Sequence, residues 1–163
     1  MITFGDSGPN PGSIPYDHAA LYSADCDYPC PPGADRKWSA NNTRWITFTG
    51  EPASSIADFE PGTEVYETPS RLRRWAAARE AQKRGLAIVY SNLSNVKRAQ
   101  DALGKVPHVW WLATLDGVQV TQDELSQRLK SDYGVDISPA AIWGNQWQQG
   151  TDYDTSDCYG DWR

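Results

Sequence analysis

The second half of the chain alternates between short apolar runs and segments with helical spacing, and this alternation constrains the fold most strongly. Residues 86–90, 109–113 and 140–147 form apolar, partly β-branched runs. Such runs are typical of strands that are buried on both faces. Strands that alternate with helices indicate a parallel sheet joined by crossover helices.

Capping signals place the helices between these runs. Thr68 can cap a helix, Pro69 suits its first position, and Gly85 can end it in the left-handed conformation. Thr121-Gln122-Asp123-Glu124 has the form of a capping box. We therefore expect helices over residues 68–85, over 94–103, and from 121 to about 134.

The first 60 residues contain strand candidates but no convincing helix. With a last short run, the further candidates are residues 2–4, 19–22, 45–48, 55–59 and 153–156, and Gly8 to Pro15 and Pro29 to Gly33 are expected loops. Eight strands suggest an α/β fold, namely a small, pared-down (β/α)8 TIM-like barrel with few or short early crossover helices. Such barrels typically take about 250 residues, so most early crossovers must shrink to loops. An open doubly wound sheet is the alternative.

The length of the chain indicates a single domain, and its net charge disfavours a nucleic-acid-binding protein. A chain of 163 residues is expected to form a single domain over 1–163. The net charge of −6 argues against nucleic-acid binding, because affinity for phosphate backbones requires clusters of Lys and Arg. The one basic cluster is expected to be a solvated helix face, and it comprises Arg71, Arg73, Arg74, Arg79, Lys83 and Arg84.

The sequence shows neither a membrane-spanning segment nor a recognisable secretory signal. No apolar run approaches the roughly 18 residues that span a membrane, so no membrane partner is expected. The opening residues MITFGDSG lack the basic head and apolar stretch of a secretory signal. We expect a protein that acts inside the cell or one that is released by another route, such as a phage product freed by lysis or carried on a virion.

Rival chemistries find little support. His18 and His108 stand apart from other ligands, so neither a metal nor another cofactor is expected. With three cysteines, Cys26, Cys30 and Cys158, at most one internal disulfide can form, and the first two are expected in a surface loop. Neither a nucleophile-elbow motif nor a phosphate-binding loop occurs in the sequence.

The informative stretch is Ser55-Ile56-Ala57-Asp58-Phe59-Glu60-Pro61-Gly62. Side chains alternate along a strand, so Asp58 and Glu60 are expected on one face and Phe59 on the other. Pro61-Gly62 ends the strand at once, which puts both acids at its carboxyl end. Glycoside hydrolysis needs two such carboxyl groups, one to protonate the leaving oxygen and one as base, nucleophile or stabiliser.

Further candidates end other strands. Asp6 closes the first strand and Asp154 lies in the last, so in a closed barrel both can face the first pair of acids. We expect substrate contacts from aromatic and amide side chains at strand ends, because such groups stack on sugar rings or hydrogen-bond to their hydroxyls. These side chains are Tyr22, Tyr90, Trp111 and Gln146.

In this order of motifs the chain resembles the family-25 lysozymes (muramidases), and more closely the glycoside-hydrolase-like barrels of actinobacteria and their phages. The matching pieces are Asp6, Asp58-Phe59-Glu60, Ile88-Val89-Tyr90-Ser91, Trp111-Leu112-Ala113, Gln146 and Tyr153-Asp154. The resemblance implies that Glu60 is the proton donor, whereas Asp58, Asp6 and Asp154 stabilise charge or position substrate and water. It also implies that the substrate is peptidoglycan, cleaved between N-acetylmuramic acid and N-acetylglucosamine.

Two functions follow as expectations. The first is a glycosidase that acts on bacterial cell-wall peptidoglycan or another polysaccharide, either alone or beside other phage virion proteins. The second is a non-catalytic carbohydrate-binding or structural module, such as a phage tail-tip component, because the chain is short, acidic and rich in Trp.

Overall fold

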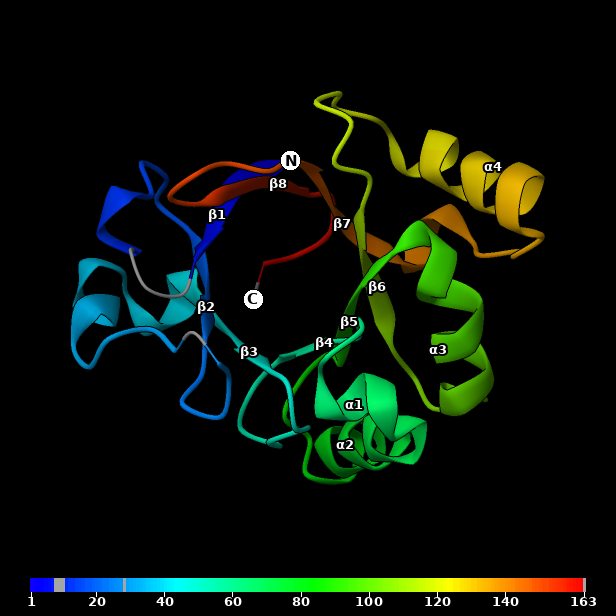
Figure 1. Ribbon diagram of the computed structural model, residues 1–163, viewed down its shortest axis with the longest axis horizontal. Coiled ribbons are helices and arrows are strands. Elements are labelled where there is room, and N and C mark those ends of the chain that lie inside the picture. The colour runs from blue at the N-terminus through cyan, green and yellow to red at the C-terminus, as the bar shows by residue number, and fades with distance from the viewer. Residues whose placement is uncertain (8–10, 28, 163) are drawn as a thin grey trace.

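A closed barrel of eight strands forms the centre of the protein (Figure 1). The structure, a computed structural model, describes residues 1–7, 11–27 and 29–162, so Gly8, Pro9 and Asn10 of the first expected loop lie outside the described residues. Each strand pairs with its neighbours in chain order, and the last pairs with the first. The strands are β1 (Ile2–Ser7), β2 (Ala19–Tyr22), β3 (Thr43–Thr47), β4 (Ile56–Asp58), β5 (Ile88–Asn92), β6 (Val109–Ala113), β7 (Ile142–Gln148) and β8 (Asp154–Cys158).

The expected fold class, a (β/α)8 TIM-like barrel, is wrong. β1 to β7 run parallel, but β8 is antiparallel to both β7 and β1, so the barrel is mixed. The described residues form only four short α-helices, and three of them lie between β4 and β6. The protein is therefore a closed mixed β-barrel with a partial helical cover.

The lengths of the connections explain this result. A parallel crossover takes a dozen or more residues, whereas β7 and β8 are joined only by residues 149–153. Such a link permits only a reversal of direction. The β2–β3 connection is longer, but Pro29, Pro31 and Pro32 fall in it, and proline disrupts the interior of an α-helix.

The helices cover one side of the barrel (Figure 1). They are α1 (Glu64–Glu67), α2 (Pro69–Ala81), α3 (Val96–Leu103) and α4 (Gln122–Tyr133). On the other side lie loops and the short 3-10 helices η1 (Pro11–Ser13), η2 (Ala34–Lys37) and η3 (Ala40–Asn42). η4 (Leu93–Asn95) precedes α3, and η5 (Pro139–Ala141) precedes β7.

The helix signals are largely confirmed. Thr121 and Glu124 form the capping box of α4, and Gly134 ends that helix in the left-handed conformation. α2 begins at Pro69 as expected, but the Thr68 side chain makes no capping hydrogen bond and the helix ends at Ala81, four residues before Gly85. No described helix has the length and apolar character needed to cross a bilayer.

Apolar clusters on the inner and outer faces of the strands hold the barrel together. Its interior is filled by a cluster that includes Phe4, Ile46, Ile88, Trp111 and Trp143. A larger cluster lies between the outer face of β4–β7 and the helices, and it includes Phe59, Val89 and Leu112. Alternate residues of one strand thus enter different layers, as the two-residue period of a strand requires.

One residue of the expected solvated helix face lies in the core instead. Arg79 is only 3% exposed. Its guanidinium donates to the backbone oxygens of Pro52, Ser54, Arg84 and Leu86. The cation thereby ties α2 to the loops that precede β4 and β5.

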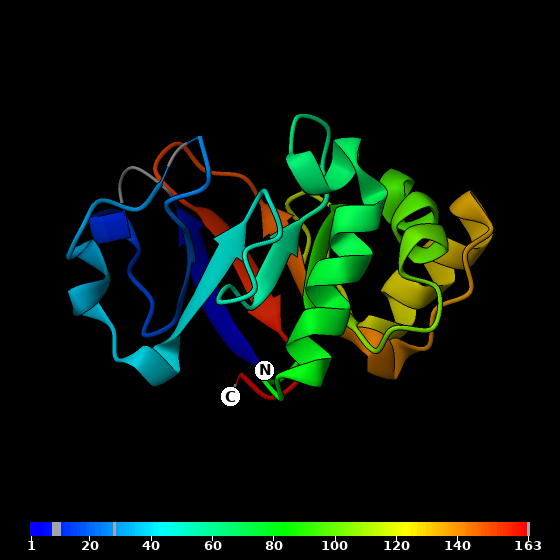
Figure 2. The same cartoon turned by 90° about the horizontal axis from the view of Figure 1, so that it is seen from below.

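The two ends of the barrel differ. Both chain termini lie at the amino end of β1, and α1 lies at the opposite end (Figure 2). At the amino end Trp162 packs on Phe4 with ring centroids 4.8 Å apart, and its backbone oxygen accepts from Arg44. The carboxyl ends of β1–β7 and the start of β8 surround the other end.

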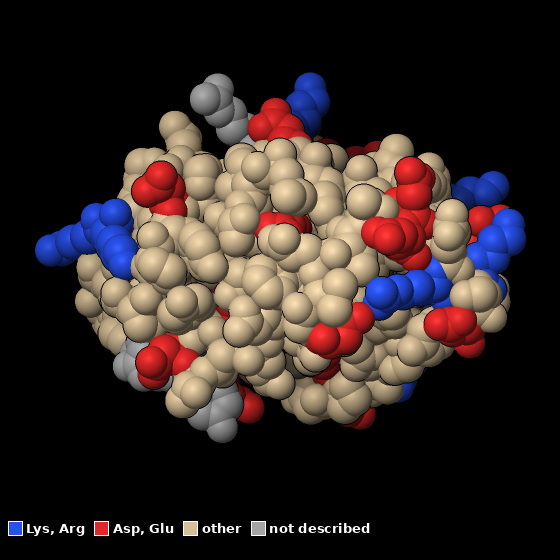
Figure 3. Space-filling view, turned by 90° about the horizontal axis from the view of Figure 1, so that it is seen from above, with Lys and Arg blue, Asp and Glu red and all other residues tan. Residues whose placement is uncertain are grey.

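The surface is acidic overall but of mixed character locally. Seen from above relative to Figure 1, acidic side chains are scattered over one face and basic side chains lie mainly toward its edges (Figure 3). In the described part of this face no continuous basic patch is visible.

Candidate active site

Carboxylates from both ends of the chain meet at the carboxyl end of the barrel. Asp6 of β1 lies directly opposite Asp154 of β8 in the antiparallel register. Asp58 is the last residue of β4 and pairs with Tyr90 of β5. Because β8 runs antiparallel, its first residue lies level with the last residues of the other strands. The reversal that contradicts the expected fold class therefore still brings Asp154 to the predicted site.

Asp58 and Glu60 lie on either side of an outward-facing phenylalanine. Phe59 belongs to the outer apolar layer and is fully buried. Its backbone N–H donates to Tyr90 O at 2.8 Å, so the ladder with β5 extends one residue past Asp58. Glu60 follows the strand and does not lie in it, and it is more exposed than Asp58, which is only 4% exposed.

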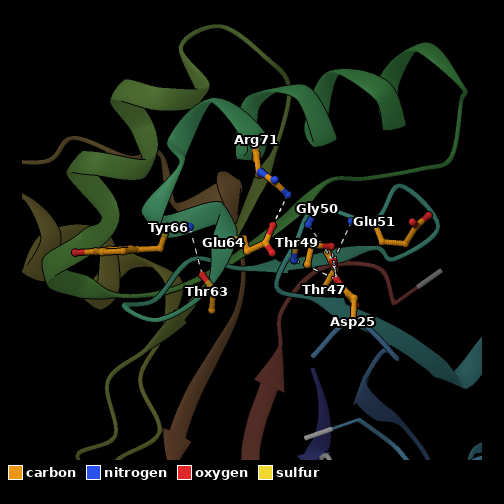
Figure 4. Close-up of polar contacts among 9 residues, drawn as sticks. All are labelled: Asp25, Thr47, Thr49, Gly50, Glu51, Thr63, Glu64, Tyr66 and Arg71. Atoms are coloured by element: carbon orange, nitrogen blue, oxygen red, sulfur yellow. Dashed lines mark hydrogen bonds and ion pairs between the residues drawn. The ribbon is translucent and has the colours of Figure 1, made fainter. Parts of the chain in front are cut away.

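Thr63 fixes the backbone of this pair. Its hydroxyl lies 2.8 Å from Asp58 O and 3.0 Å from Glu60 O, and it accepts from Tyr66 N as the N-cap of α1 (Figure 4). Thr63 is itself 4% exposed. One buried side chain thus both starts the helix and holds the peptide groups that carry the two acids.

Burial and mutual repulsion act on the two buried aspartates. Burial raises the pKa of Asp6 well above its usual range, and the charges of Asp154 and Asp58 add to the rise. Burial also raises the pKa of Asp58 strongly, with Glu60 adding to it. Oδ1 of Asp6 and Oδ1 of Asp58 are both buried without a hydrogen-bond partner among the described residues. A protonated carboxyl group is the form that such surroundings favour.

The other two carboxyl groups have partners. Burial raises the pKa of Asp154, although Gly150 N and Gln146 Nε2 donate to it at 2.9 and 2.7 Å and oppose the rise. Burial likewise raises the pKa of Glu60, against hydrogen bonds from Asn92. These hydrogen bonds stabilise the ionised forms, so acids of two kinds share the site.

Two tyrosines lie beside the acids. Burial raises the pKa of Tyr22 strongly, and the charges of Asp58, Asp6 and Asp154 add to it. The pKa of Tyr90 is raised by burial and then by Glu60 and Asp58. Both phenols therefore stay protonated and can donate hydrogen bonds to a ligand or to a carboxylate.

Trp111 and Gln146 lie deeper than their strand-end positions suggested. Each is 1% exposed. Trp111 packs on Tyr90 with ring centroids 4.7 Å apart, and its Nε1 donates to Ser156 Oγ at 3.2 Å. Gln146 donates to Asp154. In this structure both side chains support the residues around the mouth of the barrel and present no open face to a ligand.

The sequence reasoning missed Asn92. This residue ends β5, and its Nδ2 donates to Glu60 Oε1 at 3.3 Å. A signal was present, because position 92 follows Tyr90 by two and so lies on the same face of the strand. An amide carries no charge, so at the end of an apolar run it is a weaker indication of a functional residue than a carboxylate.

Asp25 shows that burial alone does not make an acid part of this site. Its carboxylate accepts a hydrogen bond from Ser23 and, as Figure 4 shows, from Thr47 and Thr49. Burial works to raise its pKa, but these hydrogen bonds outweigh burial and the pKa falls. Asp25 is thus an ionised structural group that joins the loop after β2 to the β3–β4 connection.

In the described parts of the chain, no three His, Cys, Asp or Glu side chains are arranged to hold a metal ion. His18 packs against Trp162 and His108 lies 2.7 Å from Val106 O, so neither faces the acids. The three cysteines are free thiols.

The arrangement provides the parts of an acid–base site. It combines two buried carboxyl groups that favour protonation, two partly solvated ones held by hydrogen bonds, and two phenolic donors. Carboxyl groups in different environments can divide the roles of acid and base. Comparison of the chain with protein-family models, curated proteins and solved structures found no match.

Proposed function

We propose that the protein is a glycoside hydrolase that works through carboxyl groups. The observation that carries the proposal is the gathering of Asp6, Asp58, Glu60 and Asp154 at one end of the barrel, where the charges of Asp154 and Asp58 raise the pKa of Asp6 and the charge of Glu60 raises the pKa of Asp58. Buried acids without partners cost stability, so their concentration at one place favours a functional role. Glycosidic bonds are cleaved by pairs of carboxyl groups in such surroundings.

In this proposal Glu60 is the general acid. It is more exposed than Asp58, and its raised pKa favours the protonated form that a general acid needs. Glu60 gives its proton to the glycosidic oxygen as the bond to the sugar breaks, and a water molecule then bonds to the sugar carbon and returns a proton to the Glu60 carboxylate. Asp154, whose hydrogen bonds from Gly150 and Gln146 favour the ionised form, stabilises the positive charge that develops on the sugar, and Asp6 and Asp58 position substrate or water.

The substrate class is proposed from the resemblance to family-25 lysozymes. The order of motifs along the chain favours peptidoglycan, with action at the bacterial cell wall. A phage-encoded or virion-associated protein, working beside other virion proteins, is the setting that the resemblance favours.

Substitution of the acid tests the proposal. We expect Glu60→Gln to lower the release of reducing ends from purified cell walls by about 10²- to 10⁴-fold, the range for loss of a general acid. Glu80→Gln, on the exposed face of α2, is the matched control and should keep full activity. Unchanged hydrolysis by Glu60→Gln, with circular dichroism like that of the wild type, would refute the assignment.

The deep burial of Asp6 and Asp58 favours a second candidate, a module that binds carbohydrate without cleaving it. Each aspartate is only 4% exposed, which restricts the approach of a sugar ring. Binding to cell walls without any release of reducing ends would favour this candidate. Hydrolysis by the wild-type protein would exclude it.

A further inference from the structure

We infer that Asn92 is a positioning residue for Glu60, which it holds by one carboxylate oxygen so that the other is presented to the scissile bond. The inference rests on the proposed role of Glu60 as the acid. It assigns a role to a side chain that carries no charge and that the motif order does not include.

The strand register places the two side chains level with each other. In the parallel pairing of β4 with β5, Asp58 lies opposite Tyr90. Two residues further along both segments are Glu60 and Asn92, and the bond from Phe59 N to Tyr90 O keeps the segments together up to that point. The result is the contact of 3.3 Å between Asn92 Nδ2 and Glu60 Oε1.

The amide of Asn92 can adopt only one orientation. Its Oδ1 accepts from the backbone N–H of Asn95 at 3.1 Å and from the hydroxyl of Ser94 at 2.7 Å, as the N-cap of η4. A backbone N–H can only donate, so the oxygen must face η4. The NH₂ group is therefore directed at Glu60.

This orientation has two consequences for Glu60. The hydrogen bond from Nδ2 holds Oε1 and leaves Oε2 for the transferable proton, while the backbone N–H of Asn92 also lowers the pKa of the carboxyl group. A donor also favours the ionised carboxylate, and it limits the rise in the pKa of Glu60 that burial causes. Asn92 thus limits the pKa of Glu60, so that the carboxyl group can transfer its proton to the substrate.

Other titratable groups near Glu60 are protonated or are engaged elsewhere. On β4 and β5, Asp58 and Tyr90 face it, and the charge of Glu60 raises the pKa of both. On α1, Glu64 pairs with Arg71, and Glu67 accepts from Gly62 N. Asn92 is therefore the side chain whose hydrogen bond favours the ionised form of Glu60.

Two variants of Asn92 separate this role from a structural one. Asn92→Asp keeps the oxygen that caps η4 but replaces the donor to Glu60 with a carboxylate, whose charge adds to the rise in the pKa of Glu60. Asn92→Ala loses both the cap and the side-chain donor without adding a charge, so the shift it causes in the pKa of Glu60 measures the loss of the donor alone. We expect each to raise the pKa of Glu60 by about one unit, measured by ¹³C-carboxyl NMR titration with Glu60→Gln for assignment. The alkaline limb of the pH profile of kcat/KM should move upward with it. In Asn92→Ala, kcat should fall about tenfold with KM little changed.

Ser94→Ala is the matched control, because it removes one contact to Oδ1 and leaves Nδ2 on Glu60. It should titrate like the wild type. A Glu60 that titrates as in the wild type in both Asn92 variants would overturn the inference. Absence of hydrolysis by the wild-type protein would refute the proposed function instead, and the NMR titration would still decide whether Asn92 controls Glu60.

Discussion

At the scale of single residues, the site is built from carboxyl groups whose burial the fold must tolerate. Asp58 has a buried oxygen without a hydrogen-bond partner, and burial followed by repulsion from Glu60 raises its pKa. Asp25 is also partly buried but is surrounded by donors, which lower its pKa. The two aspartates should therefore affect stability in opposite directions.

Asp58→Asn should stabilise the protein at neutral pH. The native state holds the proton of Asp58 more tightly than the unfolded state, so this group's contribution to stability is complete below about pH 4 and is lost as pH rises through the raised pKa. At pH 7 we expect the variant to gain about 2 kcal/mol in the free energy of unfolding, and at pH 4 to gain little.

Urea unfolding at both pH values measures this difference. Asp25→Asn is the control with the opposite sign, because a lowered pKa contributes stability above the pKa of the unfolded state. That variant should lose stability at pH 7. A loss of stability in Asp58→Asn at pH 7 would contradict the environment described for Asp58.

Residue chemistry predicted much of the site from the sequence, but not the depth of each side chain. A charged residue at the end of an apolar run interrupts the hydrophobic pattern of a buried strand. This interruption predicts Asp6, Asp58, Glu60 and Asp154 as candidates. Depth depends on the stagger of neighbouring strands, which no local pattern records. For this reason Trp111 was expected at the rim although it lies in the interior.

At the scale of elements, the site depends on how helices and loops hold β4, β5 and β8. Arg79 of α2 donates to backbone oxygens before β4 and before β5, including Ser54 O at 2.6 Å. Burial, with Arg44 and Arg84 adding to it, lowers its pKa to about 10. No carboxylate among the described residues pairs with this cation, so its stability depends on the fit of a planar guanidinium to carbonyl groups.

Arg79→Lys should destabilise the protein by about 3 kcal/mol, because an ammonium group cannot reproduce the planar set of donors and leaves carbonyls unpaired. Arg73→Lys, at an exposed position of the same helix, should change stability by less than about 0.5 kcal/mol. Thermal or urea unfolding of the two variants compares them directly. Equal stability of the two would show that the carbonyl contacts contribute nothing.

The β7–β8 connection should be equally sensitive, but in activity. Gly150 N donates to Asp154, and a Cβ on Gly150 would lie 2.1 Å from Tyr153 O, so the backbone would have to shift. We expect Gly150→Ala to lower hydrolysis at least tenfold through displacement of Asp154. Gly12→Ala, where a Cβ meets nothing within 4 Å, should keep full activity. Full activity of both variants would argue against a role for Asp154.

At the scale of the whole molecule, the sequence located the strands better than it determined how they are connected. The three later apolar runs, the four early candidates and the last run each overlap a strand, although several of the expected bounds extend past it. The direction of β8 was mistaken because apolar pattern is the same for either direction. The short link over residues 149–153 held the missing information, since it cannot accommodate a crossover.

The two ends of the mixed barrel differ: aromatic side chains fill one end, and the candidate active site lies at the other. Trp162 and Phe4 fill the amino end, and the acids surround the carboxyl end. Chain neighbours pair throughout, so the first and last strands meet and Asp6 lies opposite Asp154. Closure of the sheet is thus the property of the whole molecule on which the site depends.

Mass spectrometry of the fragments released from purified actinobacterial cell walls tests the central claim most directly. The account predicts soluble glycan fragments with new reducing ends after incubation with the wild-type protein, and none above background with Glu60→Gln. Intact glycan strands after incubation with folded, wall-bound wild-type protein would contradict it.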